Sequence, residues 1–477
     1  MLWQLLFNSL GFFAFAAVFF ALWPLVCRRT TSRYVAITVA SLVFYGAWDP
    51  RFVVLLLGTA FSDFMFGLGM VRSPRHKKLL LACSLAVNLG ALFVFKYSTF
   101  AARTLDGATA LLGHPTHAAD GMPTFVAILP PGISFYTFQS MSYTIDVYRG
   151  TLKPTRNPLH FLAFISMFPQ LVAGPIVRAK DLLPRLETHT APSLEARFSA
   201  VSLMVLGYWK KVVIADNLAR AVTTIYDGAG TSSGPLYWLA TLLFAAQIYA
   251  DFSGYSDIAR GLARLMGYEF PLNFDHPYTA RSMREFWQRW HITLSTWFRD
   301  YVYLPLGGNR KNATRNLWVT MLLSGLWHGA SFTFVAWGAW HALLLTVERW
   351  TRWPEHAQRS QLGRALAAPI VFVLTLLGWV FFRARTMESA LSILSSMLGL
   401  SASHTLTSDL SALRGPVFFL LLGILTEIVT ARRDRRVEAE ARVTTSSGLL
   451  RPIGVALLIV SCIYLRGPGS MFIYFQF

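Results

Sequence analysis

Apolar runs long enough to cross a lipid bilayer recur along almost the whole of the 477-residue chain. A transmembrane helix needs about 20 predominantly apolar residues. The composition agrees, because 54% of the residues are hydrophobic and only 14% are charged, whereas roughly a quarter of the residues of a soluble protein are charged. The sequence therefore predicts an all-α polytopic membrane protein with roughly eleven transmembrane helices. The runs lie near residues 2–26, 34–48, 52–71, 79–97, 124–147, 158–178, 198–220, 236–264, 316–347, 366–383, 415–431 and 449–466.

Basic residues gather in the short loops between these runs and give the chain a formal net charge of +19. Lys and Arg are enriched in the cytoplasmic loops of membrane proteins, where they also meet anionic lipid headgroups. We therefore interpret the charge as a determinant of orientation and expect no nucleic-acid partner; attraction of a polyanionic substrate is the open alternative. This orientation puts the loop Arg28–Arg33 in the cytoplasm and the closing segment Phe472–Phe477 outside.

Three segments lack the pattern of plain spans, namely Ile128–Tyr148, Phe168–Arg178 and Asp251–Arg310. They contain prolines, glycines, charges and many aromatic residues between apolar flanks. Irregular backbone at membrane depth is tolerated only where protein buries it or where it lines a cavity. We expect a functional site there, within a single transmembrane domain over residues 1–477 whose core is about residues 124–347.

His328 is the ionisable residue that stands out, because it lies within the apolar stretch Ser324–His341. Titratable groups inside a span are rare and indicate function by default. Imidazole exchanges protons near neutral pH, although a hydrogen-bonded packing role is equally open from the residue alone. Ser324 falls on the same helical face, where bonding to its own backbone is favoured over a nucleophilic role. His341 is expected over three turns further along the same helix, in a structural role.

A second polar group precedes this stretch. His291 follows Arg289 and Trp290, so a capping role is somewhat favoured over chemistry. Asp251 and Asp257 lie close to Tyr255, and an ion-pair network with nearby arginines is favoured over direct catalysis. No metal-binding motif is found, and we expect no metal site.

Several blocks of this sequence resemble the membrane-bound O-acyltransferases, in the bacterial branch typified by the membrane subunit of alginate O-acetylation. The blocks are DFSGYSDIARGL (Asp251–Leu262), EFWQRWHITLSTWFRDYVYLPLGGNR (Glu285–Arg310), SGLWHGASFTFVAWGAWH (Ser324–His341), PPGISFYTFQSMSYTIDVYRG (Pro130–Gly150), FPQLVAGPIVR (Phe168–Arg178) and FIYFQF (Phe472–Phe477). The resemblance implies a bundle of roughly eleven transmembrane helices, with re-entrant and interfacial helices around a central funnel and tunnel. It also implies that His328 is the catalytic base and that His291 assists it.

The implied activity is transfer of acetyl groups from a cytoplasmic thioester, with acetyl-CoA as the expected donor, across the bacterial inner membrane. The acceptor would be an exported polysaccharide such as alginate, reached with a periplasmic acetyltransferase partner. No bound cofactor is expected. Oxyanion stabilisation needs a hydrogen-bond donor, for which Trp327 is one candidate. The residues expected to bind substrate are Trp327, Asp251, Tyr255 and Asn273.

Three alternatives stay open at this point. The same fold could transfer D-alanine to teichoic acid from a carrier-protein thioester. A transporter of lipid or sugar would show two related halves, and no such repeat is found. A scaffold of a secretion complex would tolerate loss of its histidines.

Overall fold

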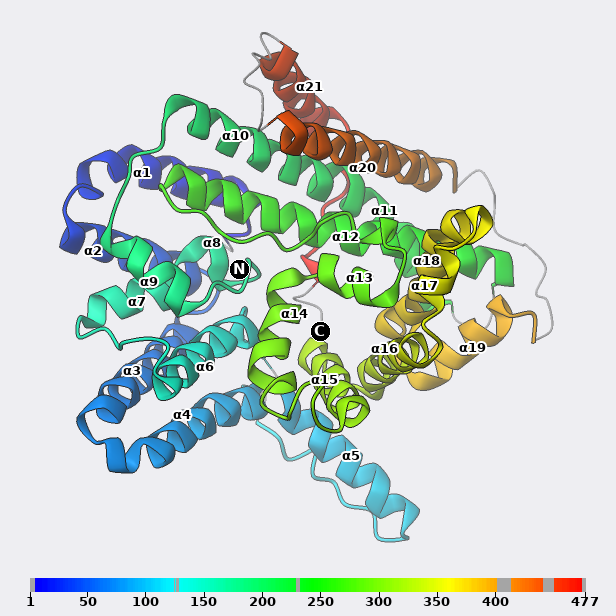
Figure 1. Ribbon diagram of the computed structural model, residues 1–477, viewed down its shortest axis with the longest axis horizontal. Coiled ribbons are helices and arrows are strands. Elements are labelled where there is room, and N and C mark those ends of the chain that lie inside the picture. The colour runs from blue at the N-terminus through cyan, green and yellow to red at the C-terminus, as the bar shows by residue number, and fades with distance from the viewer. Residues whose placement is uncertain are drawn as a thin grey trace. The chain divides into compact units, whose positions relative to one another are not determined.

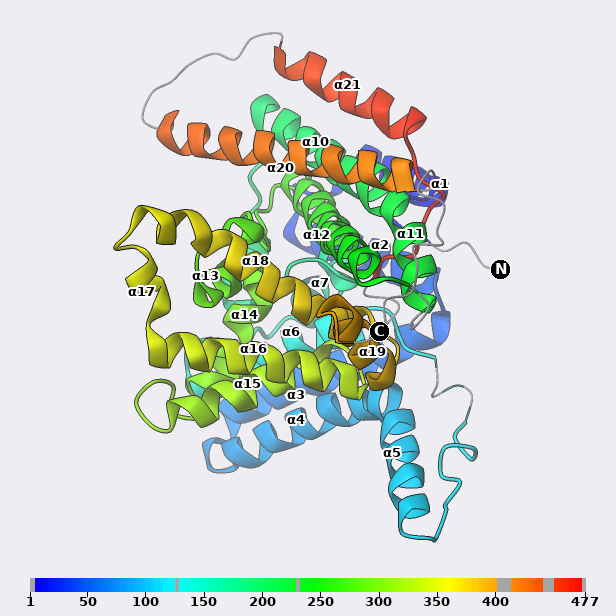
Figure 2. The ribbon, with the colours of Figure 1, turned by 90° about the vertical axis from the view of Figure 1, so that its right-hand side faces the viewer.

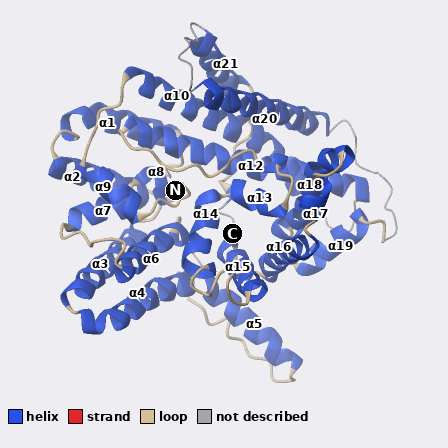
Figure 3. Ribbon diagram, viewed as in Figure 1, coloured by secondary structure: helices blue, strands red, loops and turns tan. Residues whose placement is uncertain are grey.

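A computed structural model describes the chain except for residues 1–4, 124, 126, 127, 229–231, 401–412, 441–449 and 474–477. The described part is helical throughout and contains no strand (Figure 3), which confirms the all-α prediction. Five helices or helical segments in the described part are long and apolar enough to span a membrane. They are Pro50–Arg72, Pro74–Leu111, Leu194–Asp227, Gln361–Arg383 and Arg414–Arg432. The count of eleven and the central funnel stay predictions.

The chain forms two compact units, residues 1–200 with 259–271, and residues 201–258 with 272–477. Two helices run from one unit into the other, α10 (Leu194–Tyr208) and α12 (Gly234–Leu265). The expectation of one transmembrane domain over the whole chain stays a prediction.

The first unit is organised around the buried carboxylate of Asp63. It accepts hydrogen bonds from Ser84 at 2.6 Å, from Asn88 at 2.7 Å and from Ser140. Three donors from two other helices satisfy a charge that would otherwise be costly inside a span. The helices of this unit are α1 (Leu10–Val26), α2 (Thr30–Gly46), α3 (Pro50–Arg72), η1 (Pro74–His76), α4 (Lys77–Leu92), η2 (Phe93–Tyr97), α5 (Ser98–Leu111), α6 (Ile133–Arg149), α7 (Pro158–Ser166), α8 (Phe168–Leu171) and α9 (Ala179–Glu187).

Two of the segments predicted to be broken belong to this unit. Helix α6 begins only after Gly132, whose φ of 73° needs the conformational freedom of glycine. The run 158–178 divides into α7, the four-residue α8 and an irregular stretch. Both observations confirm that these segments are not plain spans.

The second unit contains the central helices α15 (Ala313–His328) and α16 (Phe332–Thr351), which lie side by side (Figure 2). Its other elements are η3 (Trp209–Ala215), α11 (Asp216–Asp227), η4 (Pro277–Thr279), α13 (Met283–Arg289), α14 (Ile292–Phe298), η5 (Arg299–Tyr303), α17 (Trp353–Ala357), α18 (Gln361–Arg383), α19 (Met387–Met397), α20 (Arg414–Glu440) and α21 (Leu450–Tyr464). The third segment predicted to be broken therefore consists of the end of α12 followed by the short helices η4, α13, α14 and η5 (Figure 1).

The expectation that His328 and His341 share one helix is wrong. Helix α15 ends at His328, and α16 begins after Ser331, whose hydroxyl accepts the backbone N–H of Thr333. Gly329 has an extended backbone with φ of −160° and stops the first helix. A capping serine close behind a glycine outweighs the apolar continuity of the run.

The two helices pack at glycine positions. A Cβ atom at Gly325 would lie 2.2 Å from the carbonyl oxygen of Phe334, and one at Gly338 would lie 2.5 Å from that of Met321. Because no side chain separates the backbones, the helices approach closely. The backbones are therefore in close contact one turn before His328.

Candidate active site

His328 is the last residue of α15, and its side chain is enclosed by aromatic rings. The residue is 2% exposed. Its ring centroid lies 4.9 Å from that of Trp337, 5.0 Å from that of Trp327 and 5.1 Å from that of Phe382. Three elements thus surround the imidazole, since Trp337 comes from α16 and Phe382 from α18.

His291 joins α13 to α14 in a left-handed conformation, with φ of 42°, and is fully buried. Its ring lies 4.6 Å from Phe252 and 6.0 Å from Trp327. Since Trp327 also contacts His328, one indole lies against both histidines. The structure therefore brings together the two histidines that the sequence analysis singled out.

Asn273 holds the start of α14, directly after His291. Its carbonyl oxygen accepts the backbone N–H of Ile292 at 2.9 Å, and its side-chain oxygen accepts the Thr293 hydroxyl at 2.6 Å. The amide nitrogen donates to Ser256 at 3.1 Å. These hydrogen bonds fix the backbone directly after His291.

Asp251 belongs to a buried ion cluster. Lys211 Nζ lies 2.7 Å from Asp251 and 2.9 Å from Asp216. The second oxygen of Asp251 accepts the backbone N–H of Ile473 at 2.7 Å. The predicted ion-pair network is confirmed, but its base is a lysine of η3 rather than an arginine, and Lys210 likewise pairs with Asp257 at 2.7 Å.

The ion cluster holds Phe472 and Ile473 beside this site. Phe472 contacts Tyr255 with ring centroids 4.6 Å apart, and contacts Phe252 at 5.8 Å. Phe252 in turn contacts His291. The last four residues of the FIYFQF block, 474–477, lie outside the described residues.

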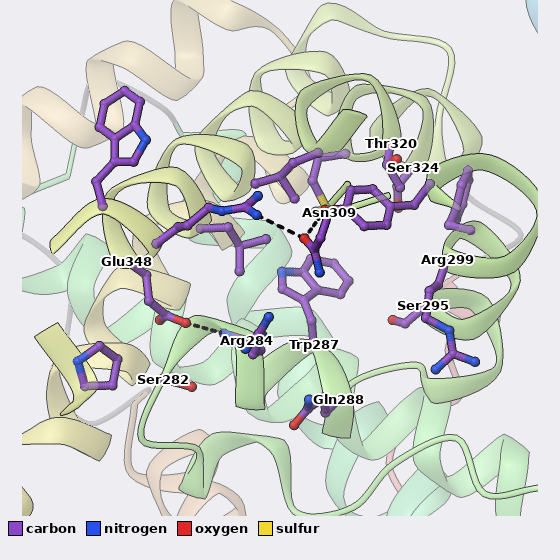
Figure 4. A pocket seen from close by; sticks show the side chains of 18 of the residues that line it. Ser282, Arg284, Trp287, Gln288, Ser295, Arg299, Asn309, Thr320, Ser324 and Glu348 are labelled. Atoms are coloured by element: carbon purple, nitrogen blue, oxygen red, sulfur yellow. Dashed lines mark hydrogen bonds between the residues drawn. The ribbon is translucent and has the colours of Figure 1, made fainter. Parts of the chain in front are cut away.

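A cavity of about 1080 Å³ opens beside α13, α15 and α16. Ser324 lines it one helical turn before His328, and Trp287 projects between its walls (Figure 4). Four arginines line it as well, against two glutamates. The charged lining residues are Arg284, Arg299, Arg349, Arg352, Glu348 and Glu355.

Glu348 fixes one wall of this cavity, at the end of α16 beyond the apolar run. Its carboxylate accepts the backbone N–H of Met283 at 2.5 Å. It also accepts the backbone N–H of Arg284 at 3.1 Å (Figure 4). Burial raises the pKa of Glu348, although these two donors act in the opposite direction. The carboxylate thus caps α13, the helix that leads to His291.

The arginines escaped the sequence analysis, because they come from two distant stretches. Arg284 lies in the first turn of α13 and Arg299 directly follows α14, whereas Arg349 and Arg352 follow an apolar run. Their positive charge was evident from the sequence, but it did not show that they converge on one cavity.

A second, smaller cavity of about 310 Å³ lies at the other end of α18. Gln247 and Asp216 line it, and both side chains are buried. Phe382, which contacts His328, directly precedes Arg383 on its rim. Further lining residues are Arg220, Thr223, Thr224, Ser470 and Arg383.

The described helices thus enclose His328 in aromatic rings, and Ser324, one turn before it, lines a large cavity with four arginines. Residues 151–391 match the model of the membrane-bound O-acyltransferase family. The chain belongs to this family of multi-pass membrane proteins and is an O-acyltransferase.

Its relatives include several enzymes of polymer modification. A "Probable alginate O-acetylase" of Pseudomonas putida is 37% identical over 98% of this chain and 99% of its own length. The "Peptidoglycan O-acetyltransferase" of Helicobacter pylori is 35% identical over 76% of this chain and 73% of its own. A "Teichoic acid D-alanyltransferase" of Streptococcus thermophilus is 32% identical, but over only 43% of this chain and 53% of its own length. The wider coverage by O-acetyltransferases disfavours the D-alanyl alternative.

Proposed function

We propose that this enzyme transfers acetyl groups from a cytoplasmic thioester donor, across a bacterial inner membrane, to an exported polysaccharide. The observation that carries the proposal is the basic cavity, whose lining includes Ser324, one turn from His328. A donor that enters there has its reactive end close to the only histidine we assign as the base.

Acetyl-CoA is the donor that fits the cavity chemistry. Coenzyme A carries phosphate groups, and the planar guanidinium of arginine binds phosphate oxygens in a bidentate manner. The four arginines at the cavity would neutralise this charge, and the volume of about 1080 Å³ accommodates a nucleotide with an extended arm.

His328 would act as general base on the acceptor hydroxyl, which is a poor nucleophile until its proton is removed. The hydroxyl oxygen then attacks the thioester carbonyl, and the carbon–sulfur bond breaks after the tetrahedral intermediate. In this mechanism the Trp327 indole, held between both histidines, is the candidate donor for the oxyanion.

The other predicted site residues would act indirectly, by positioning the groups around the two histidines. Asn273 would hold the backbone of His291, while Asp251 and Tyr255 would hold the segment that contains Phe472 and Ile473. This assignment gives them positioning roles toward the substrate rather than direct contacts.

The acceptor would approach from the second cavity. Helix α18 is 23 residues long and apolar enough to cross the bilayer, a length of about 34 Å. The basic cavity borders α17, directly before this helix, and the second cavity borders its last residue, Arg383. Donor and acceptor would thus reach the site from opposite faces, the acceptor side being open to the polysaccharide or to a periplasmic transferase partner.

The test is alkali-releasable acetate on exported and envelope polysaccharide from wild type, a deletion strain and a His328→Ala strain at matched protein levels. We expect equal loss in the deletion and in His328→Ala, with no loss in His114→Ala, an exposed histidine as control. Unchanged acetate in the deletion strain would refute the proposal, and esterified D-alanine would then be measured.

A further inference from the structure

A group of buried polar atoms that no described protein group satisfies lies around Trp337, the indole that contacts His328. Native interiors leave few polar atoms unpaired, because an unpaired buried polar atom is costly. Such a concentration of unpaired atoms indicates that water or a polar part of a substrate occupies this region. The atoms are Nε1 of Trp287, Nε1 of Trp337, Nε1 of Trp379, and both ring nitrogens of His341.

His341 is the only member of this group that can both accept and donate a proton. It is fully buried in α16. Its ring stacks in parallel on Phe286, with centroids 6.0 Å apart and an interplanar angle of 6°. On its edges it meets Trp337 at 4.9 Å and Trp287 at 5.1 Å.

These contacts form a continuous sequence from the cavity to the catalytic histidine. Trp287 lines the cavity and contacts His341. His341 contacts Trp337, and Trp337 contacts His328 at 4.9 Å. This proximity arises because the helix is interrupted at Gly329 and α16 folds back along α15.

A glycine leaves room for this imidazole. A Cβ atom at Gly378 of α18 would lie 3.1 Å from His341 Nε2. Any larger side chain there would press on that nitrogen, so the helix approaches the ring without covering it by a side chain.

A buried histidine with a purely structural role looks different in the same chain. His160 is 3% exposed and stacks on Tyr34, with centroids 4.7 Å apart. Its Nε2 lies 2.9 Å from the carbonyl oxygen of Leu183, and its Nδ1 lies 3.1 Å from the Thr155 hydroxyl. Both nitrogens of His160 are paired, whereas neither nitrogen of His341 is paired within the described residues.

Acyl transfer from a thioester leaves a proton to be moved. The hydroxyl proton goes to His328, the new carbon–oxygen bond forms, and the carbon–sulfur bond breaks. The sulfur leaves as a thiolate, which needs one proton to become the thiol. The proton is therefore on His328, while the leaving sulfur is on the cavity side.

We propose that His341 relays this proton, through water, from His328 to the leaving sulfur. One ring nitrogen accepts a proton on the side of His328 while the other gives up its own proton on the side of the cavity. The imidazole remains neutral overall and only changes tautomer, which suits a buried position. No proton is gained or lost in the complete cycle, and the proposal rests on the thioester donor of the proposed function.

The test varies the acidity of the leaving thiol. Purified enzyme is assayed for acetyl transfer with acetyl-CoA and with S-(4-nitrophenyl) thioacetate, whose thiol is much more acidic and leaves without a proton. Wild type, His341→Phe and His160→Phe are compared after subtraction of spontaneous hydrolysis. Phenylalanine preserves ring size and stacking but removes both nitrogens.

We expect His341→Phe to lose about a hundredfold in kcat with acetyl-CoA and to regain most of this loss with the aryl thioester. His160→Phe should change both rates by the same factor. Equal loss with both donors in His341→Phe, or no loss at all, would overturn the relay. If the wild type uses neither thioester, the proposed donor is wrong and the relay falls with it.

Discussion

The ring of His328 meets the indole of Trp337 edge to face, with centroids 4.9 Å apart and an interplanar angle of 85°. This contact fixes the plane of the imidazole, which in the proposed mechanism presents one nitrogen to a hydroxyl. We expect Trp337→Leu to lower kcat about a hundredfold with little change in KM for the donor, because the donor cavity does not include Trp337. Steady-state kinetics of purified protein would show the effect, and a rise in KM alone would contradict it.

Close packing of α15 against α16 can be tested with two alanine substitutions. Gly325→Ala would put a Cβ 2.2 Å from the Phe334 carbonyl oxygen and should destabilise the protein by about 1–3 kcal/mol. Gly90→Ala, in α4, meets nothing within 4 Å and should be neutral or stabilising. Thermal unfolding in detergent would compare them; equal midpoints would refute the interpretation.

The stability of the buried cluster around Lys211 should depend on the lysine cation. Lys211→Met would leave Asp216 and Asp251 without their cation and should cost about 3–5 kcal/mol. Arg385→Ala removes an exposed pair with Asp227 and should cost at most about 1 kcal/mol. Protease resistance of the C-terminal segment would report the first change. If both variants resist proteolysis equally, the cluster does not anchor that segment.

The backbone at His291 distinguishes among substitutions by their tolerance of a positive φ. Asparagine tolerates the left-handed conformation better than other non-glycine residues, so His291→Asn should fold. His291→Val should be less stable than His291→Asn by about 1–2 kcal/mol. Thermal midpoints of the two variants would test this order, and a reversed order would argue against the observed φ of 42°.

Glu348 gives the stability of the cavity wall a defined pH dependence. Because burial raises its pKa, the folded protein binds the proton more tightly than the unfolded chain does. Stability is therefore lost as the pH rises through the folded-state pKa and is gained as it falls toward the ordinary value of 4.5. As the pH falls from neutrality toward 4.5, the wild type should gain stability relative to Glu348→Gln. Parallel stability curves for the two proteins would contradict this prediction.

His328 was recognisable from sequence because an ionisable residue in an apolar run is costly unless it has a function. Its surroundings were not, since Trp337 and Phe382 belong to other helices and aromatic residues carry no signal of their partners. The position of His341 was misjudged because the apolar run continues across Gly329, whereas the helix ends there. The lysine at the carboxylates was missed because it is distant in the sequence, while arginines close to Asp251 and Asp257 offered the same charge.

The aromatic enclosure of His328 has a consequence for the surrounding lipid. Only 2% of the residue is exposed, so acyl chains do not solvate its imidazole. Bilayer thickness and headgroup composition should then alter how long the folded protein survives, while the chemical step proceeds at the same rate in detergent micelles, nanodiscs and vesicles. Protein side chains, rather than lipid, therefore form the environment of the His328 imidazole.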